Sequence, residues 1–187
     1  QPSGCYPASS TMDTGQNPTH FASAFFEYLL RNGVRICHWK SNRHLDAALA
    51  GQTDLDVLVH KDDREGLEAA FVRFGFTQML GPWESRYPGL EDWLGMDPGS
   101  GRLLHMHVHY RLIVGPQKVK CFHPPLEEWV LENLRSVQST PVPRAEIELV
   151  LLILRMHLKL YARRLRRRAH RPGREIFPPD IAREFDW

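Results

Sequence analysis

Two strand-like segments that flank a short helix constrain the fold of this chain most strongly. Residues 34–39 and 55–59 are rich in β-branched and aromatic residues, and residues 42–50 between them have the spacing of a short helix. Asp54 and Asp56 stand at the start of the second strand. Because alternate residues of a strand project to the same face, their carboxylates are expected to point together. Carboxylate oxygens are the ligands that Mg²⁺ prefers, so this pair predicts a site for a divalent cation.

The rest of the chain predicts more helices and strands around this unit. Apolar residues recur at helical spacing in four further segments: 19–32, 62–74, 126–133 and 145–168. Residues 76–80 are expected as an edge strand and residues 102–114 as a long alternating strand, whereas 81–101 is expected to be an excursion with a helical turn near 90–94. This order predicts an α/β (α+β) fold with a small mixed sheet flanked by helices and a long C-terminal helix.

The segment Lys40-Ser41-Asn42 followed by Asp54-Leu55-Asp56 resembles the nucleotidyltransferase superfamily, which has the polymerase-beta-like fold. The family pattern is a strand ending in Gly-Ser, a helix, and a strand beginning Asp-x-Asp. Bacterial nucleotidyltransferase-like domains with a Trp-Lys-Ser-Asn segment and a later histidine-rich strand are the most similar, and the resemblance covers residues 19–160. It implies transfer of a nucleoside monophosphate from an NTP to an acceptor hydroxyl with Mg²⁺ (or Mn²⁺), and it implies Asp54 and Asp56 as catalytic metal ligands.

Lys40, Ser41 and Asn42 form the expected phosphate cradle. They lie where a strand ends and a helix begins, and backbone N–H groups at such a position attract anions. The family usually has Gly at the position of Lys40, because the backbone there approaches the phosphates closely. The alternative is an ordinary helix cap formed by Ser41 or Asn42.

Three histidines mark the later strand. His105, His107 and His109 alternate with apolar residues, so they are expected to share one strand face and to lie near the acidic pair. In the family pattern a third carboxylate comes from such a strand, and this chain has histidine there instead. The three histidines are candidate metal ligands, with His107 favoured as the catalytic residue or general base. The alternative is a set of histidines on a solvated sheet face.

Basic residues near the C-terminus suggest two kinds of anion binding. Arg155 and Lys159 are one helical turn apart and are candidate nucleotide-binding residues, or else part of a solvated cationic face. Residues 163–174 contain seven arginines and no acid. The segment from Arg163 to Arg174 therefore suggests nucleic acid as a further partner, although a basic helix end also complements the helix dipole.

Composition favours a compact protein without a membrane span. The chain has 187 residues, of which 42% are hydrophobic, and the longest apolar run is too short and too interrupted to cross a bilayer. Three widely spaced cysteines and the lack of a signal-like N-terminus predict reduced thiols and a cytoplasmic location. We expect a flexible extension over residues 1–18, an α/β core over 19–140, and a C-terminal helix with a basic tail over 141–187.

Other functions are open at this point. The chain could be a catalytically inactive nucleotide-binding module of the same fold within a larger protein, since Lys40 and the histidine strand both depart from the family pattern. It could be an RNA-interacting protein that uses the Arg-rich segment. A histidine-metal hydrolase unrelated to NTPs is a further possibility. The acceptor and the preferred NTP are not readable from the sequence.

Overall fold

The structure is a computed structural model that describes residues 21–82, 86–115 and 122–169, with side chains described as far as residue 160 in the last helix. Its elements in chain order are α1 (Phe21–Arg31), β1 (Ile36–His38), the 3₁₀ helix η1 (Asn42–His44), α2 (Leu45–Leu49), β2 (Leu55–Val59), the 3₁₀ helix η2 (Lys61–Asp63), α3 (Arg64–Phe74), β3 (Thr77–Met79), β4 (Leu90–Met96), β5 (Leu103–His109), α4 (Glu127–Glu132), β6 (Leu134–Val137), β7 (Thr140–Pro143) and α5 (Ala145–Ala169).

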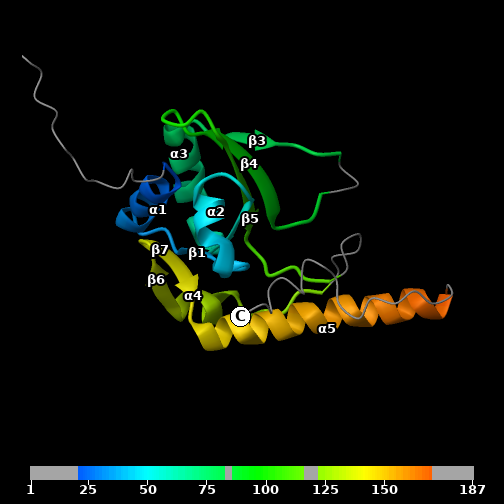
Figure 1. Ribbon diagram of the computed structural model, residues 1–187. Coiled ribbons are helices and arrows are strands. Elements are labelled where there is room, and N and C mark those ends of the chain that lie inside the picture. The colour runs from blue at the N-terminus through cyan, green and yellow to red at the C-terminus, as the bar shows by residue number, and fades with distance from the viewer. Residues whose placement is uncertain (1–20, 83–85, 116–121, 170–187) are drawn as a thin grey trace, which may run out of the picture.

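A five-stranded mixed sheet forms the centre of the fold (Figure 1). The strand order is β1-β2-β5-β4-β3, and β2 and β5 run parallel while the other neighbours are antiparallel. Helices flank the sheet, and the long helix α5 is the last described element in the sequence. The α/β (α+β) fold class expected from the sequence is therefore confirmed.

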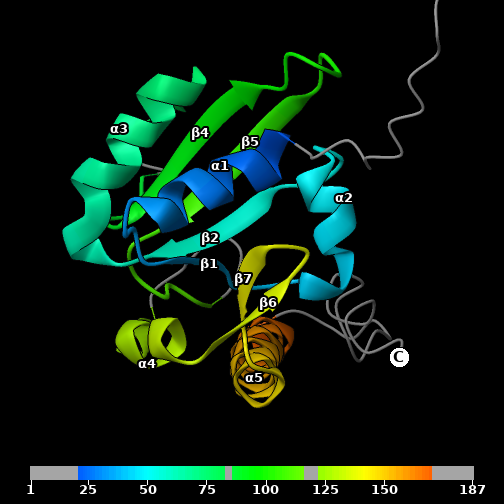
Figure 2. The same cartoon turned by 90° about the vertical axis from the view of Figure 1, so that its left-hand side faces the viewer.

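Helices α1, α2 and α3 cover one face of the sheet (Figure 2). Phe71 of α3 is the centre of an aromatic cluster, and its ring stacks on Trp93 at 4.3 Å and on Phe25 at 5.3 Å between centroids. Gly51, with φ of +67°, lets the chain leave α2 close to β5, since a Cβ there would lie 2.7 Å from the carbonyl oxygen of Leu103. This packing fixes the inward faces of β2 and β5 and so directs their other side chains to the opposite face.

A second apolar cluster lies on the opposite face. Cys37 and Trp39 of the β1 region pack with Ile147 and Leu151 of α5 and with Val130 of α4. The remainder of that face carries polar side chains of β2, β4 and β5. The described part of α5 thus borders a polar sheet surface, which is where the candidate site lies.

Three parts of the fold differ from the sequence prediction. The long strand expected over residues 102–114 ends at His109. Residues 90–94, expected as a helical turn, belong to β4, which pairs along its whole length with β5. The prolines and glycines around this strand suggested a loop, but the strand residue Trp93 is buried in the core because β5 and β3 both pair with β4. The hairpin of β6 and β7 was not predicted at all, since it is short and contains two prolines.

The chain was expected to divide into residues 1–18, 19–140 and 141–187, and the described residues lie only in the last two parts. The extension predicted over residues 1–18 lies outside the described residues. Strand β7 runs across residue 140, where we expected the core to end, and it contacts β1 and α1. Within the described ranges, no helix has the length and apolar character needed to cross a membrane.

Candidate metal centre

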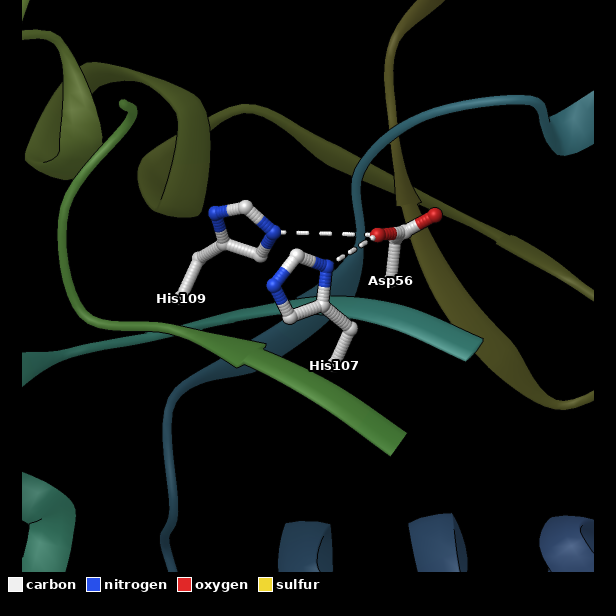
Figure 3. Close-up of side chains that lie close together, drawn as sticks. All are labelled: Asp56, His107 and His109. Atoms are coloured by element: carbon white, nitrogen blue, oxygen red, sulfur yellow. Dashed lines mark hydrogen bonds and ion pairs between the residues drawn. The ribbon is translucent and has the colours of Figure 1, made fainter. Parts of the chain in front are cut away.

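Strands β2 and β5 bring Asp56 together with His107 and His109 on the polar face of the sheet (Figure 3). Asp56 lies opposite His107 in the parallel register. The Oδ1 atom of Asp56 is 3.1 Å from Nδ1 of His107 and 3.7 Å from Nε2 of His109. One ligand atom of each residue lies within 4.8 Å of the other two, so a single metal ion could contact all three.

His109 is the most unusual member of this metal group. Its side chain is 1% exposed, and neither ring nitrogen has a hydrogen-bond partner among the described residues. The 3.7 Å contact with Asp56 is too long for a hydrogen bond. Buried polar atoms without partners are costly, so they call for an explanation such as an ion. The unpartnered nitrogens and the carboxylate fit a metal ligand set.

The protonation states also fit a cation site. Burial lowers the pKa of His109 to about 3, so its imidazole is neutral and has lone pairs for a metal. Burial would raise the pKa of Asp56, but the Lys40 ammonium and the imidazoles of His107 and His109 hold it well below its usual range. The carboxylate is therefore ionised, and the group offers one anionic and two imidazole ligands.

Lys40 reaches this group from the end of β1. Its Nζ atom is 2.6 Å from Oδ1 of Asp56 and 5.6 Å from the centroid of the Trp39 ring. The same indole packs edge-on against His109 at 5.0 Å and lies 5.8 Å from the guanidinium carbon of Arg155. Two of the predicted phosphate-binding cations therefore lie beside the metal group. Trp39, which the sequence did not single out, is the residue that both contact.

Ser41 and Asn42, the rest of the expected cradle, have distinct roles. Ser41 adopts the left-handed conformation with φ of +59°, which is uncommon for a residue other than Gly, Asn or Asp. The Asn42 amide contacts Nδ1 of His38 through its oxygen and donates to Glu148 of α5 through its nitrogen. Both polar ends of Asn42 are thus engaged in joining the loop to β1 and α5.

Asp54 and His105 form a separate cluster with Asp92 of β4. Nδ1 of His105 is 2.8 Å from Asp54, and its Nε2 is 2.9 Å from Asp92. The hydrogen bond with Asp92 is the main cause that raises the pKa of His105 to about 9, with Asp54 adding to it. His105 is therefore an imidazolium with both nitrogens engaged, unlike a metal ligand. The two aspartates expected to act together are each paired with a different histidine.

Asp92 was missed by the sequence prediction. It lies opposite His107 in the antiparallel register of β4 and β5, so the row Asp56, His107 and Asp92 crosses three neighbouring strands. The signal was hidden because residues 90–94 were expected as a helical turn. A strand prediction for residues 90–94, paired with the histidine strand, would have made the Asp92 carboxylate a candidate site residue.

A cavity of about 480 Å³ opens beside the metal group. Its wall includes His107 and Asp92, together with Gln78, Tyr87 and Leu90. Tyr87 thus contributes an aromatic ring to the wall, whereas Trp93 of β4 is buried in the core. The cavity gives a ligand access to the edge of the metal group.

The remaining basic residues lie along α5. Lys159 is partly exposed one turn beyond Arg155. The backbone of α5 continues to Ala169, through the first arginines of the Arg-rich segment. The side chains of Arg163 to Arg168 and all of residues 170–174 lie outside what is described, so nucleic-acid binding by this segment stays a prediction.

Comparisons with protein-family models, with curated proteins and with solved structures yield no match to this chain. The resemblance to nucleotidyltransferases in the residue pattern thus stays a prediction. The geometry of the metal group and its cavity is the basis for assigning a function.

Proposed function

We propose that this chain is a metal-dependent nucleotidyltransferase that moves a nucleoside monophosphate from an NTP to an acceptor hydroxyl. The observation that carries the proposal is that His107 lies beside Asp56 on the neighbouring parallel strand, with His109 adjoining both. In the nucleotidyltransferase pattern this position belongs to a third carboxylate, and a histidine here can serve as the corresponding ligand. The adjacent cavity supports the proposal because it gives a substrate access to His107.

The proposed metal ligands are Asp56, His107 and His109. A set of one carboxylate and two neutral imidazoles favours a first-row transition metal over Mg²⁺, since imidazole nitrogen suits such ions better. Of the two ions expected from the sequence we therefore propose Mn²⁺. When bound, the ion supplies electrostatic stabilisation to the triphosphate and to the charge that develops during transfer.

Residues around the group have roles that follow from their positions. Lys40 and Arg155, both near the Trp39 ring, supply positive charge for the triphosphate. Asp92 in the cavity wall is placed to accept the proton of an acceptor hydroxyl, and His105 orients it through the 2.9 Å contact. Catalysis would come from alignment and charge stabilisation rather than from a covalent intermediate.

A catalytically silent nucleotide-binding module of the same fold is the second candidate. The ion pairs support it, because Asp54 pairs with His105 while Asp56 pairs with Lys40. The two aspartates therefore do not converge on one cation as the family pattern would have them.

Pyrophosphate release separates the two candidates. The protein is incubated with each NTP, Mn²⁺ and a metabolite fraction as the source of acceptors, and release is compared for the wild type, Asp56→Asn and Asp62→Asn. Asp62 is a matched control because its side chain is 67% exposed on η2. The proposal predicts release by the wild type and by Asp62→Asn but not by Asp56→Asn. Binding of NTP without release favours the silent module, and the absence of both binding and release refutes both candidates.

A further inference from the structure

The backbone places Trp39 opposite Asp56, and Lys40 follows as the next residue. The amide of Trp39 donates to the carbonyl oxygen of Asp56 at 3.1 Å, which extends the pairing of β1 and β2 by one step. The next residue is Lys40, whose side chain then reaches the carboxylate of Asp56. The paired neighbour Trp39 thus holds the start of the Lys40 side chain near Asp56, and the bend at Lys40 lets that side chain reach the carboxylate.

Three groups converge on a single oxygen of Asp56. The Oδ1 atom lies 2.6 Å from Nζ of Lys40, 3.1 Å from Nδ1 of His107 and 3.7 Å from Nε2 of His109. The Lys40 side chain is 22% exposed and that of Asp56 is 13% exposed, so water screens this pair only in part. The ammonium thus binds the same oxygen that the metal group would present to an ion.

A divalent ion and the Lys40 ammonium would compete for this carboxylate. Both are cations, and their repulsion at such short range is strong in a partly buried setting. An ion bound by His107 and His109 would displace the ammonium. The Lys40 side chain has four flexible methylenes, so it can turn away while the backbone stays in place.

A second cation lies near Lys40. Arg155 lies 5.8 Å from the Trp39 ring that Lys40 also faces. A phosphate bound at this end of the group would meet cations from both the β1 loop and α5. Binding of the metal ion would therefore free the Lys40 ammonium to bind a phosphate.

We propose that Lys40 is an internal cation that Asp56 holds until a divalent metal ion replaces it, and that the released ammonium then binds a phosphate group of the ligand. This inference rests on the metal site of the proposed function but not on catalysis. It makes Lys40 a positioning residue that sets the order of binding, with the metal first and the phosphate second. It also gives a reason for a lysine where the family pattern has glycine.

Calorimetric titration with Mn²⁺ tests the exchange. The variants are Lys40→Met, which removes the ammonium, Lys40→Arg, which keeps a positive charge, and Lys61→Met, a control on the exposed η2 helix. Lys40→Met is expected to bind Mn²⁺ at least about tenfold more tightly than the wild type, since about 1.4 kcal/mol of lost competition corresponds to that factor. Lys61→Met is expected to match the wild type, and Lys40→Arg to stay within about threefold of it.

The phosphate step is measured separately with inorganic pyrophosphate at saturating Mn²⁺. Lys40→Met is expected to bind pyrophosphate about tenfold more weakly than the wild type, although it binds the metal more tightly. These opposite changes are hard to produce by misfolding, which would weaken both. Thermal unfolding of each variant checks that the fold is kept, and Lys40→Gln, which also removes the charge, replaces Lys40→Met if that variant does not fold.

The results that overturn the inference are specific. Equal or weaker Mn²⁺ binding by Lys40→Met would show that the ammonium does not compete with the ion. Unchanged pyrophosphate binding would show that the released ammonium does not bind the phosphate. Failure of every variant to bind Mn²⁺ would overturn the inference together with the metal site. Tighter metal binding by Lys40→Met, together with a wild type that transfers no nucleotide, would support the exchange while refuting the transferase proposal, so the two failures can be told apart.

Discussion

Asp56 and His107 lie at the same level of two neighbouring parallel strands, with Oδ1 of the aspartate 3.1 Å from Nδ1 of the histidine. The pairing is set by the register of β2 and β5, and the apolar residues on the other face of both strands fix that register. A slip of one residue would turn the carboxylate and the imidazole into the core. The site is therefore built into the fold rather than added on a loop.

Replacing His109 is expected to separate stability from metal binding. His109→Leu removes two buried ring nitrogens that have no partner among the described residues, so without metal it should stabilise the protein by about 1 kcal/mol. The same change removes a metal ligand. Urea unfolding in EDTA and in Mn²⁺ measures both effects: the metal should stabilise the wild type but not His109→Leu. A variant that is still stabilised by Mn²⁺ would exclude His109 as a ligand.

The pair of Lys40 and Asp56 should show strong coupling in metal-free protein. Asp56→Asn leaves a partly buried ammonium without its carboxylate and is expected to cost about 2 kcal/mol, somewhat less than for a fully buried pair. Lys40→Met in the Asp56→Asn background should recover much of that loss. A double-mutant cycle by urea unfolding in EDTA measures the coupling. Additive effects of the two changes would mean that the pair is not formed in solution.

The pair of Arg35 and Asp63 predicts an acid-dependent loss of stability. Two hydrogen bonds from the Arg35 side chain and one from its backbone amide lower the pKa of Asp63 below its usual value of 3.8. Because the folded-state pKa is depressed, this contribution is present above pH 3.8 and is lost as the pH falls through the folded-state pKa. The stability deficit of Asp63→Asn relative to the wild type should therefore be full at pH 7 and should shrink as the pH falls below 3.8. A difference that persists unchanged at pH 2 would contradict the ionic origin of the effect.

Asp92 is expected to act on turnover rather than on metal binding. As a proton acceptor in the cavity wall, its replacement by Asn should lower the rate of pyrophosphate release by at least about 100-fold. The affinity for Mn²⁺, held by residues of β2 and β5, should change little. A rate assay and a Mn²⁺ titration of Asp92→Asn check the two parts. Loss of metal binding with the rate at saturating Mn²⁺ unchanged would make Asp92 a ligand instead.

Most of the fold could be predicted from residue periodicity. The helices and the strands β1, β2 and β5 follow apolar patterns that local sequence shows directly, and alternation in β5 correctly placed its three histidines on one face. Strand β4 was missed because its pairing partners, rather than its own composition, determine its conformation. The glycines and prolines near Trp93 are typical of loops, so the sequence predicted an irregular segment there instead of a strand.

The candidate site was predicted in part. Asp56 and His107 were expected together, and the structure brings them together because β2 and β5 are neighbours. The division of the aspartates between two histidines could not be predicted, since it depends on Asp92 and hence on β4. The contact of Lys40 with Asp56 could not be predicted either, because it depends on the pairing of Trp39 with Asp56 and on the bend at Lys40.

The most direct test of the metal centre is the anomalous scattering of crystals soaked in Mn²⁺. The proposal predicts one strong peak between the Asp56 carboxylate and the imidazoles of His107 and His109, with the Lys40 ammonium moved away from Asp56. A peak elsewhere with these side chains unchanged, or no peak at saturating Mn²⁺, would contradict it.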